Sequence, residues 1–380
     1  MKRKFLIFIL AFFILSFFIL RTNNPVKDRL NNCQNLKSSS EKLQCWEDLI
    51  DSKINSKDIE GAFEIVEQLY KDDPVFVSNC HDFVHLIGQK TYQLFSENQK
   101  FNLPNKTAYC GYGFYHAFME ALVNDGADLN KARQFCDWVD QKMHSKNADV
   151  KGACYHGIGH GTADNHDTKK WKDEADLVDN ALDLCEQVAL DQVLLNRCSS
   201  GVFNVLAIAY FSNRLKMDSK DPLWFCRKFQ NDIYQKTCYE EMNTALFVLS
   251  NKDFLRAAKF IAEIKKDEFA TSAMRSLASV FGVSAVQSED FEKIISGCRQ
   301  LQARLRLSCL RGFAAGFMEG GSPGTEYEKA LKYCQINILT EQEKAACFEE
   351  LLWLSSINYP KEKHQTICNL VDNEFRKYCQ

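Results

Sequence analysis

The arrangement of sixteen cysteines constrains this chain more than any other feature, because they fall into eight neighbouring pairs. The spacing is too long for the Cys-x2-Cys motifs of zinc modules, and an even cysteine count in an exported chain favours disulfides. We therefore predict sequential disulfides, with a Cys110–Cys136 link as the alternative that would overturn this scheme. Two pairs are widely spaced, Cys80/Cys110 and Cys136/Cys154, and six are 11 to 13 residues apart: Cys33/Cys45, Cys185/Cys198, Cys226/Cys238, Cys298/Cys309, Cys334/Cys347 and Cys368/Cys379.

One further pair is missing, and both of its positions are missing together. Residues 273–278 align with residues 309–314, which places Ala273 at a second-cysteine position. The corresponding first-cysteine position, eleven residues earlier, is Ala262. Joint loss is expected of a disulfide, since a single remaining thiol is reactive in an oxidising compartment. A metal site gives no such simple account of the joint loss.

The first twenty residues indicate the compartment. Basic residues 2–4 precede an apolar run from Phe5 to Leu20, which is the pattern of an export signal. No small-x-small cleavage site follows, so we predict an uncleaved transmembrane signal anchor, whereas cleavage would give a secreted protein. The excess of positive charge before the run places the N-terminus in the cytoplasm. The predicted organisation is a basic stub with an anchor helix at residues 1–21 and an extracytoplasmic helical repeat domain at residues 22–380.

The second cysteine of each pair marks a repeat of 32 to 44 residues from Cys154 onward, which is the period of stacked two-helix repeats. An amphipathic stretch precedes each first cysteine, as in residues 176–185, and a more apolar stretch follows each second cysteine, as in residues 198–206. We predict an all-α fold, a right-handed, solenoid-like array of disulfide-stapled helical hairpins. Its architecture is tetratricopeptide-like, although the consensus residues of tetratricopeptide repeats are absent.

Glycines recur at one position of this repeat. The third residue after the second cysteine of a pair is glycine in four units, where it lets neighbouring helices approach closely. Residues 156–161 hold three glycines, which are costly inside a helix, so close packing is expected there too. The four repeat glycines are Gly113, Gly157, Gly201 and Gly312.

Composition and motifs exclude several classes of function. A net charge of -3 and a pI near 6.3, without a dense basic stripe after Arg21, argue against nucleic acid as the main partner. No phosphate-binding glycine loop, His-Glu-x2-His run or Gly-x-Ser-x-Gly elbow is present. With every cysteine assigned to a pair, a thiol nucleophile is not expected.

Five of the eight histidines gather in three short segments, residues 80–85, 110–116 and 154–160. His81 and His85 are spaced i,i+4, as are His156 and His160, which places each pair on one helix face. His116 and His160 both stand six residues after a cysteine, so they are expected to meet between adjacent units. The fold does not require histidine at this position, because later units carry Asn204, Thr244, Ser279, Ala315 and Trp353 there.

Imidazole and carboxylate groups suit a zinc, iron or manganese ion, in a site of one or two metals. Asp82 or Asp164 is expected to act as ligand or base. Glu120 receives less weight, because residues 317–319 repeat residues 118–120 in a unit without histidine. His144, His166 and His364 follow no register and are interpreted as surface residues. The predicted metal ligands are His81, His85, His116, His156, His160 and Asp164.

Together these features predict a membrane-anchored, extracytoplasmic helical-repeat protein with a histidine-rich divalent-metal site, serving a metal-dependent hydrolytic or oxidative step. The alternative is a non-enzymatic scaffold whose concave face binds a protein or peptide, with the histidines as polar lining. The expected partners are the membrane, through the N-terminal helix, and such a protein or peptide ligand. Nucleic acid is not expected.

Overall fold

The computed structural model describes residues 25–97, 100–126, 128–163, 171–288 and 290–379. The predicted anchor helix at residues 1–21 lies outside this part of the chain. The described residues form helices joined by turns and loops, with no strand among them. The chain divides into two compact units, residues 1–58 and 59–380. The described part of the first unit is a hairpin of α2 (Pro25–Gln34) and α3 (Ser39–Asn55), joined by the Cys33–Cys45 disulfide.

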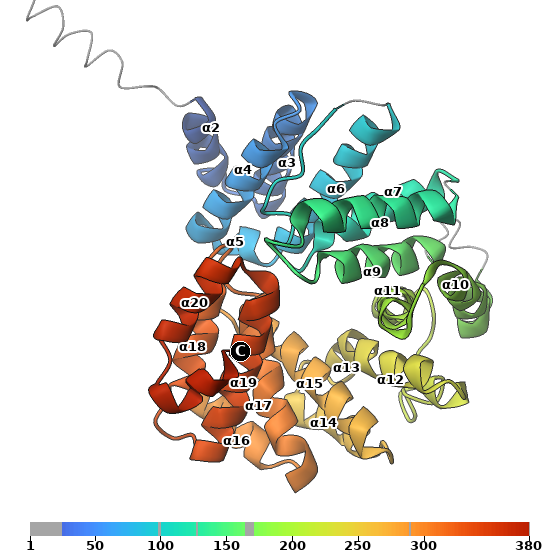
Figure 1. The fold of residues 1–380 in the computed structure, drawn as a ribbon, viewed down its shortest axis with the longest axis vertical. Coiled ribbons are helices and arrows are strands. Elements are labelled where there is room, and N and C mark those ends of the chain that lie inside the picture. The colour runs from blue at the N-terminus through green and yellow to red at the C-terminus, as the bar shows by residue number, and fades with distance from the viewer. Residues whose placement is uncertain (1–24, 98–99, 127, 164–170, 289, 380) are drawn as a thin grey trace, which may run out of the picture. The chain divides into compact units, whose positions relative to one another are not determined.

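The second unit contains a row of inner helices, each packed against the next along the chain, and outer helices that cover them (Figure 1). At its start, α4 (Ile59–Asp72) and the short α5 (Pro74–Val77) precede the first inner helix. The inner helices are α6 (Cys80–Ser96), α7 (Gly113–Asn124), α9 (Val150–Ala163), α11 (Gln192–Phe211), α12 (Asp232–Glu241) with α13 (Asn243–Leu249), α15 (Asp267–Ser284), α17 (Ala303–Glu319) and α19 (Glu341–Asn358). The outer elements are α8 (Leu129–Met143), α10 (Glu174–Val188), η1 (Cys226–Lys228), α14 (Phe254–Ala262), α16 (Phe291–Arg299), α18 (Tyr327–Cys334), α20 (Lys361–Asn369) and η2 (Asn373–Tyr378).

The disulfides follow the predicted sequential scheme. The two wide pairs, Cys80–Cys110 and Cys136–Cys154, are bonded as expected, and the Cys110–Cys136 alternative is excluded. The six close pairs are bonded as well, and no cysteine is free. Disulfides at this density are typical of proteins from oxidising compartments.

The unit that lacks a disulfide keeps the same helical hairpin. Ala262 is the last residue of α14, and Ala273 lies fully buried in α15, against which α14 packs. These are the places that cysteines occupy in the neighbouring unit, where Cys298 lies near the end of α16 and Cys309 lies within α17. The hairpin therefore forms from packing alone.

From α9 onward the inner helices begin earlier than predicted, whereas α6 begins at Cys80 as expected and α7 begins at Gly113, three residues after Cys110. A start at the second cysteine was expected, but α11, α12, α15, α17 and α19 each begin six residues before that position. Side-chain caps set several of these starts: Asp191 accepts a hydrogen bond from the Leu194 N–H, and Thr340 forms a capping box with Glu343. The second cysteine consequently lies in the second turn of its helix.

The repeated glycines mark close contacts between inner helices, as predicted. A Cβ atom on Gly201 would lie 2.0 Å from the backbone oxygen of His156, and one on Gly159 would lie 1.9 Å from that of Cys198. Real Cβ atoms do not approach carbonyl oxygens so closely, so α9 and α11 can pack at this distance only with glycine at both positions.

One described helix, α11, is long and apolar enough to cross a membrane. Two thirds of its most apolar stretch is buried inside the protein, and Cys198 links it to α10. We therefore interpret α11 as a core helix.

The last hairpins of the second unit contact its first ones. The Ala148 N–H, just before α9, donates to the Ile357 backbone oxygen at 2.8 Å, and the Tyr112 hydroxyl donates to Asn358 Oδ1 at 2.9 Å. The Tyr70 hydroxyl donates to the Gly320 backbone oxygen. In a simple array each unit contacts only its sequence neighbours. These hydrogen bonds, which we call the seam, join segments about 200 residues or more apart in the chain.

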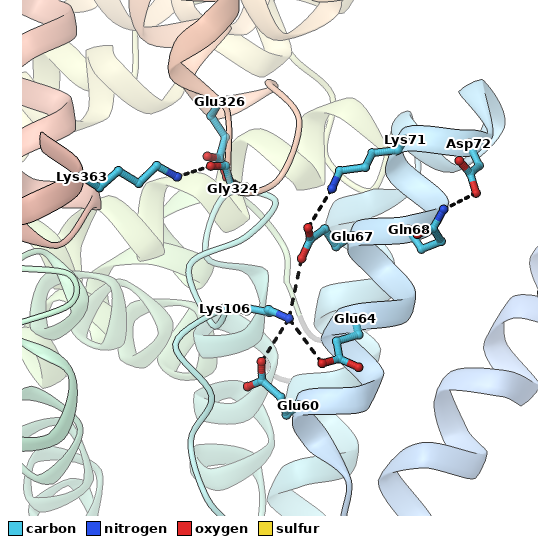
Figure 2. A network of polar contacts seen from close by, with 10 residues as sticks. All are labelled: Glu60, Glu64, Glu67, Gln68, Lys71, Asp72, Lys106, Gly324, Glu326 and Lys363. Carbon is cyan, nitrogen blue, oxygen red and sulfur yellow. Dashed lines mark hydrogen bonds and ion pairs between the residues drawn. The ribbon is translucent and has the colours of Figure 1, made fainter. Parts of the chain in front are cut away.

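A network of charged side chains lies near the seam (Figure 2). Lys106 reaches three carboxylates of α4 at 3.1 to 3.9 Å, and the Lys363 ammonium donates to the Gly324 backbone oxygen. Burial raises the pKa of Glu326, whose carboxylate accepts hydrogen bonds from the Tyr359 hydroxyl and the Gly324 N–H. Lys106 and Glu326, which are not exposed, thus have charged or hydrogen-bonding partners, as groups away from solvent require.

Candidate metal centre

Three neighbouring inner helices bring the five clustered histidines together. His81 and His85 come from the first two turns of α6, His116 from α7, and His156 and His160 from α9. The i,i+4 spacing places each pair on one face of its helix, as the sequence analysis predicted. The expected meeting of His116 with His160 is also confirmed, because the two rings stack with centroids 4.9 Å apart.

The rings form two groups of three. The ligand nitrogens of His81, His85 and His116 lie within 4.8 Å of one another, and so do those of His116, His156 and His160. We call these the first and the second triad. Accessibility differs between them, because His81 is exposed whereas His160 in the second triad is only 3% exposed.

Hydrogen bonds from Nδ1 orient three of these rings. The Nδ1–H of His81 donates to the Cys110 backbone oxygen at 2.7 Å, and that of His160 points at Glu120 Oε1 at 3.4 Å. The Nδ1–H of His156 donates to Ser200 Oγ at 2.9 Å. Since these acceptors assign the proton to Nδ1, the Nε2 lone pair of each ring is left for a ligand.

Ser200, the acceptor for His156, is itself held by a hydrogen bond to another side chain. The Ser200 hydroxyl donates to Glu241 Oε1 at 2.5 Å, and the Asn204 amide donates to Oε2 of the same carboxylate at 3.0 Å. Burial raises the pKa of Glu241. This chain orients the His156 ring from α11 and α12, the next inner helices.

Burial favours the uncharged form of three of these rings, those of His85, His116 and His156. It lowers the pKa of His85 to about 2, with smaller contributions from the nearby imidazoles of His81 and His160. Burial likewise holds the pKa values of His116 and His156 well below the usual value, and the other imidazoles add to this. A neutral imidazole has the free lone pair that metal coordination needs, so these rings need not lose a proton before binding.

Three buried ring nitrogens have no hydrogen-bond partner in the described part of the chain. They are His85 Nε2, His116 Nδ1 and His160 Nε2. Leaving a buried polar atom unpaired costs about 1–3 kcal/mol, so such atoms usually mark a ligand or an ordered water. Three of them among five clustered histidines fit a metal ion.

A left-handed turn positions the first triad. Cys110, Gly111 and Tyr112 all have positive φ, between 53° and 72°, a conformation that non-glycine residues rarely adopt. The turn presents the Cys110 backbone oxygen to His81, and the Cys80–Cys110 disulfide fixes it to the start of α6. The strained backbone is thus located where it orients a candidate ligand.

Two carboxylates lie beside the triads, and the sequence analysis gave them too little weight. Glu120 contacts His160, although its recurrence as Glu319 suggested a repeat residue without a role at the site. A Cβ on Gly111 would lie 3.4 Å from His81 Nδ1 and 3.5 Å from Glu319 Oε1, so Glu319 lies near the first triad. The i,i+4 spacing of His116 and Glu120 was the signal for the former. No sequence signal pointed to Glu319.

The remaining predicted residues lie elsewhere. Asp82 is exposed in the first turn of α6 and belongs to neither triad. Asp164 and His166 lie outside the described residues. His144 is exposed and pairs with Asp140, as expected of a surface residue. His364 is half-buried rather than fully at the surface, and its Nδ1 lies 2.7 Å from Ser355 Oγ.

No family model matches this sequence, and no curated protein or solved structure is significantly similar to it.

Proposed function

We propose that this protein binds divalent transition-metal ions through His81, His85, His116, His156 and His160. The observation that carries this proposal is the set of three buried, unpartnered imidazole nitrogens within two triads of histidine rings that share His116. A polar lining would be expected to pair these nitrogens with other protein groups. Asp164 stays in the proposal as a further ligand or base, from its spacing to His160.

The ligand chemistry narrows the choice of ion. Imidazole suits zinc, copper, iron and nickel, whereas manganese favours oxygen ligands. The described ligand atoms are imidazole nitrogens, with Glu120 placed to orient His160. We therefore favour zinc, copper or iron over manganese.

The proposal extends to a hydrolytic or oxidative reaction. A bound ion of this kind supplies Lewis acidity, or redox chemistry where the metal is copper or iron. The exposed His81 gives access to the first triad, and Glu319 beside it is a candidate proton acceptor. In the second triad, Ser200 orients the His156 ring and Glu120 orients the His160 ring.

The proposal includes the location of the protein and its membrane topology. We infer a single-pass membrane protein, anchored by residues 5–20 with the N-terminus in the cytoplasm and the hairpins outside. The basic residues 2–4 before the apolar run and the eight disulfides support this topology. We also propose that the hairpins are solenoid-like, tetratricopeptide-like repeats, supported by the serial packing of the inner helices.

A second candidate function, binding of a protein or peptide along the inner helices, has one supporting observation. Trp353 occupies the position in α19 that corresponds to His116, and 51% of its surface is exposed. The guanidinium carbon of Arg275 lies over its ring, 5.4 Å from the ring centroid. Exposed tryptophan and arginine are enriched where proteins bind partners.

Metal analysis decides between the two candidates. Full-length protein in detergent, incubated with zinc, iron, copper or manganese and then desalted, should retain one or two equivalents by mass spectrometry, one for each triad. The double variant His116→Ala/His160→Ala should lose them, because it removes ligands from both triads. His144→Ala, which changes an exposed histidine outside the triads, is the matched control. No retained metal in the wild-type protein would reject the metal site and favour the partner-binding scaffold.

A further inference from the structure

His116 is the one histidine that belongs to both triads among the described residues. Its ring centroid lies 5.4 and 5.5 Å from those of His81 and His85, and 4.6 and 4.9 Å from those of His156 and His160. The His116 ring therefore lies between the pair from α6 and the pair from α9, the two helices that pack against α7.

The surroundings of His116 differ from those of the other rings. His81, His156 and His160 each direct Nδ1 at a protein acceptor, which leaves one nitrogen per ring for an ion. The His116 ring makes no hydrogen bond to any described residue, and its Nδ1 is buried and unpaired. Metal-bound histidines almost always donate their second nitrogen to an acceptor. The lack of one at His116 is explained if both of its nitrogens are ligands.

We propose that the site is dinuclear and that the His116 imidazole bridges two metal ions, an inference that rests on the proposed metal-binding function. His81 and His85 complete the coordination of the first ion, and His156 and His160 that of the second. Binding the first ion to one nitrogen leaves the ring proton on the other. The second ion takes the place of that proton, which is released to solvent, so the bridge is an imidazolate.

The two ions have unequal surroundings. The second triad contains His160, which is 3% exposed and contacts Glu120. Its His156 donates to Ser200, which in turn donates to Glu241. The first triad includes the exposed His81. We therefore expect the ion at the first triad to exchange faster and to leave first when a chelator is added.

Copper(II) gives a direct test, because an imidazolate bridge couples two copper spins antiferromagnetically. Full-length, metal-free protein in detergent is titrated with Cu(II), and the spin concentration is measured by electron paramagnetic resonance beside the total copper content. Coupling predicts about one spin per protein at one equivalent and a fall towards zero at two equivalents, as the bridge closes. His144→Ala should behave like the wild-type protein.

Variants test the assignment of each ion. His85→Ala should keep one uncoupled copper at the second triad, and His160→Ala one at the first. The test therefore does not require a His116→Ala variant, which would have to fold without its central ring. Two bound coppers with two full spins would overturn the bridge while leaving metal binding intact, and so would saturation at one copper. Binding of no copper at all would instead reject the proposed function itself.

Discussion

At the residue scale, the absence of a side chain at Gly113 makes room for a candidate ligand. A Cβ there would lie 2.7 Å from His85 Cδ2 and 3.0 Å from the His81 backbone oxygen. We expect Gly113→Ala to displace the His85 ring and to cost about 1–3 kcal/mol of folding free energy through overpacking. It should also weaken metal binding at the first triad. Denaturant unfolding and calorimetric zinc titration measure the two effects.

Gly297 provides the matched control. It lies within α16, and a Cβ added there would have Phe254 Cδ1 as its nearest neighbour, at an ordinary 3.8 Å. Gly297→Ala should therefore be neutral or stabilise the protein by up to about 1 kcal/mol, without a change in zinc affinity. Equal zinc affinities for both variants would contradict the role of Gly113.

Residue spacing was enough to predict the five histidines, because i,i+4 pairs and a shared repeat position determine which faces meet. It was not enough for their partners. Ser200 of α11 contacts His156, Glu241 of α12 supports Ser200, and Cys110 contributes a backbone oxygen that carries no sequence signal. Such contacts depend on how helices pack, which side-chain periodicity alone does not determine.

At the scale of the helical element, the missing disulfide can be restored. We expect Ala262→Cys/Ala273→Cys to form a disulfide, because these residues occupy the positions in the α14–α15 hairpin that Cys298 and Cys309 occupy in the neighbouring hairpin, with the same separation of 11 residues. Closing this loop should stabilise the protein by on the order of 3 kcal/mol in the chain-entropy model. Thiol counting and denaturant unfolding, with and without reductant, measure the outcome.

The single variants Ala262→Cys and Ala273→Cys control for the substitutions themselves, and each should keep one free thiol without added stability. A double variant that still shows two free thiols after oxidation would mean that this hairpin differs from the stapled ones. At this scale the sequence predicted the disulfide pairing but not the helix starts. The caps Asp191 and Thr340 carried that information, whereas the cysteines only mark the second turn.

At the scale of the whole molecule, the seam could not be predicted from the repeat. A repeat pattern determines contacts between neighbouring units, but the seam joins Ala148 to Ile357 and Tyr112 to Asn358, which have no related spacing. These contacts arise only once the packing of every intervening hairpin has been fixed. The seam also brings Glu319 of α17 near the first triad, which is why that carboxylate was missed.

The seam should couple the stability of the first and last hairpins of the second unit. The Tyr112 hydroxyl accepts from the Asn147 amide at 2.8 Å and donates to Asn358 Oδ1 at 2.9 Å, so Tyr112→Phe removes the hydrogen-bond partner of both groups at a cost of about 1–3 kcal/mol. We expect faster hydrogen–deuterium exchange not only near residue 112 but through α18, α19 and α20. The control is Tyr92→Phe, which removes a hydroxyl bonded to Asp125 between α6 and the end of α7, away from the seam. Its effect should stay within those helices. If Tyr112→Phe were equally local, the last hairpins would be stable without the seam, and the unit would behave as an open array of independent neighbours.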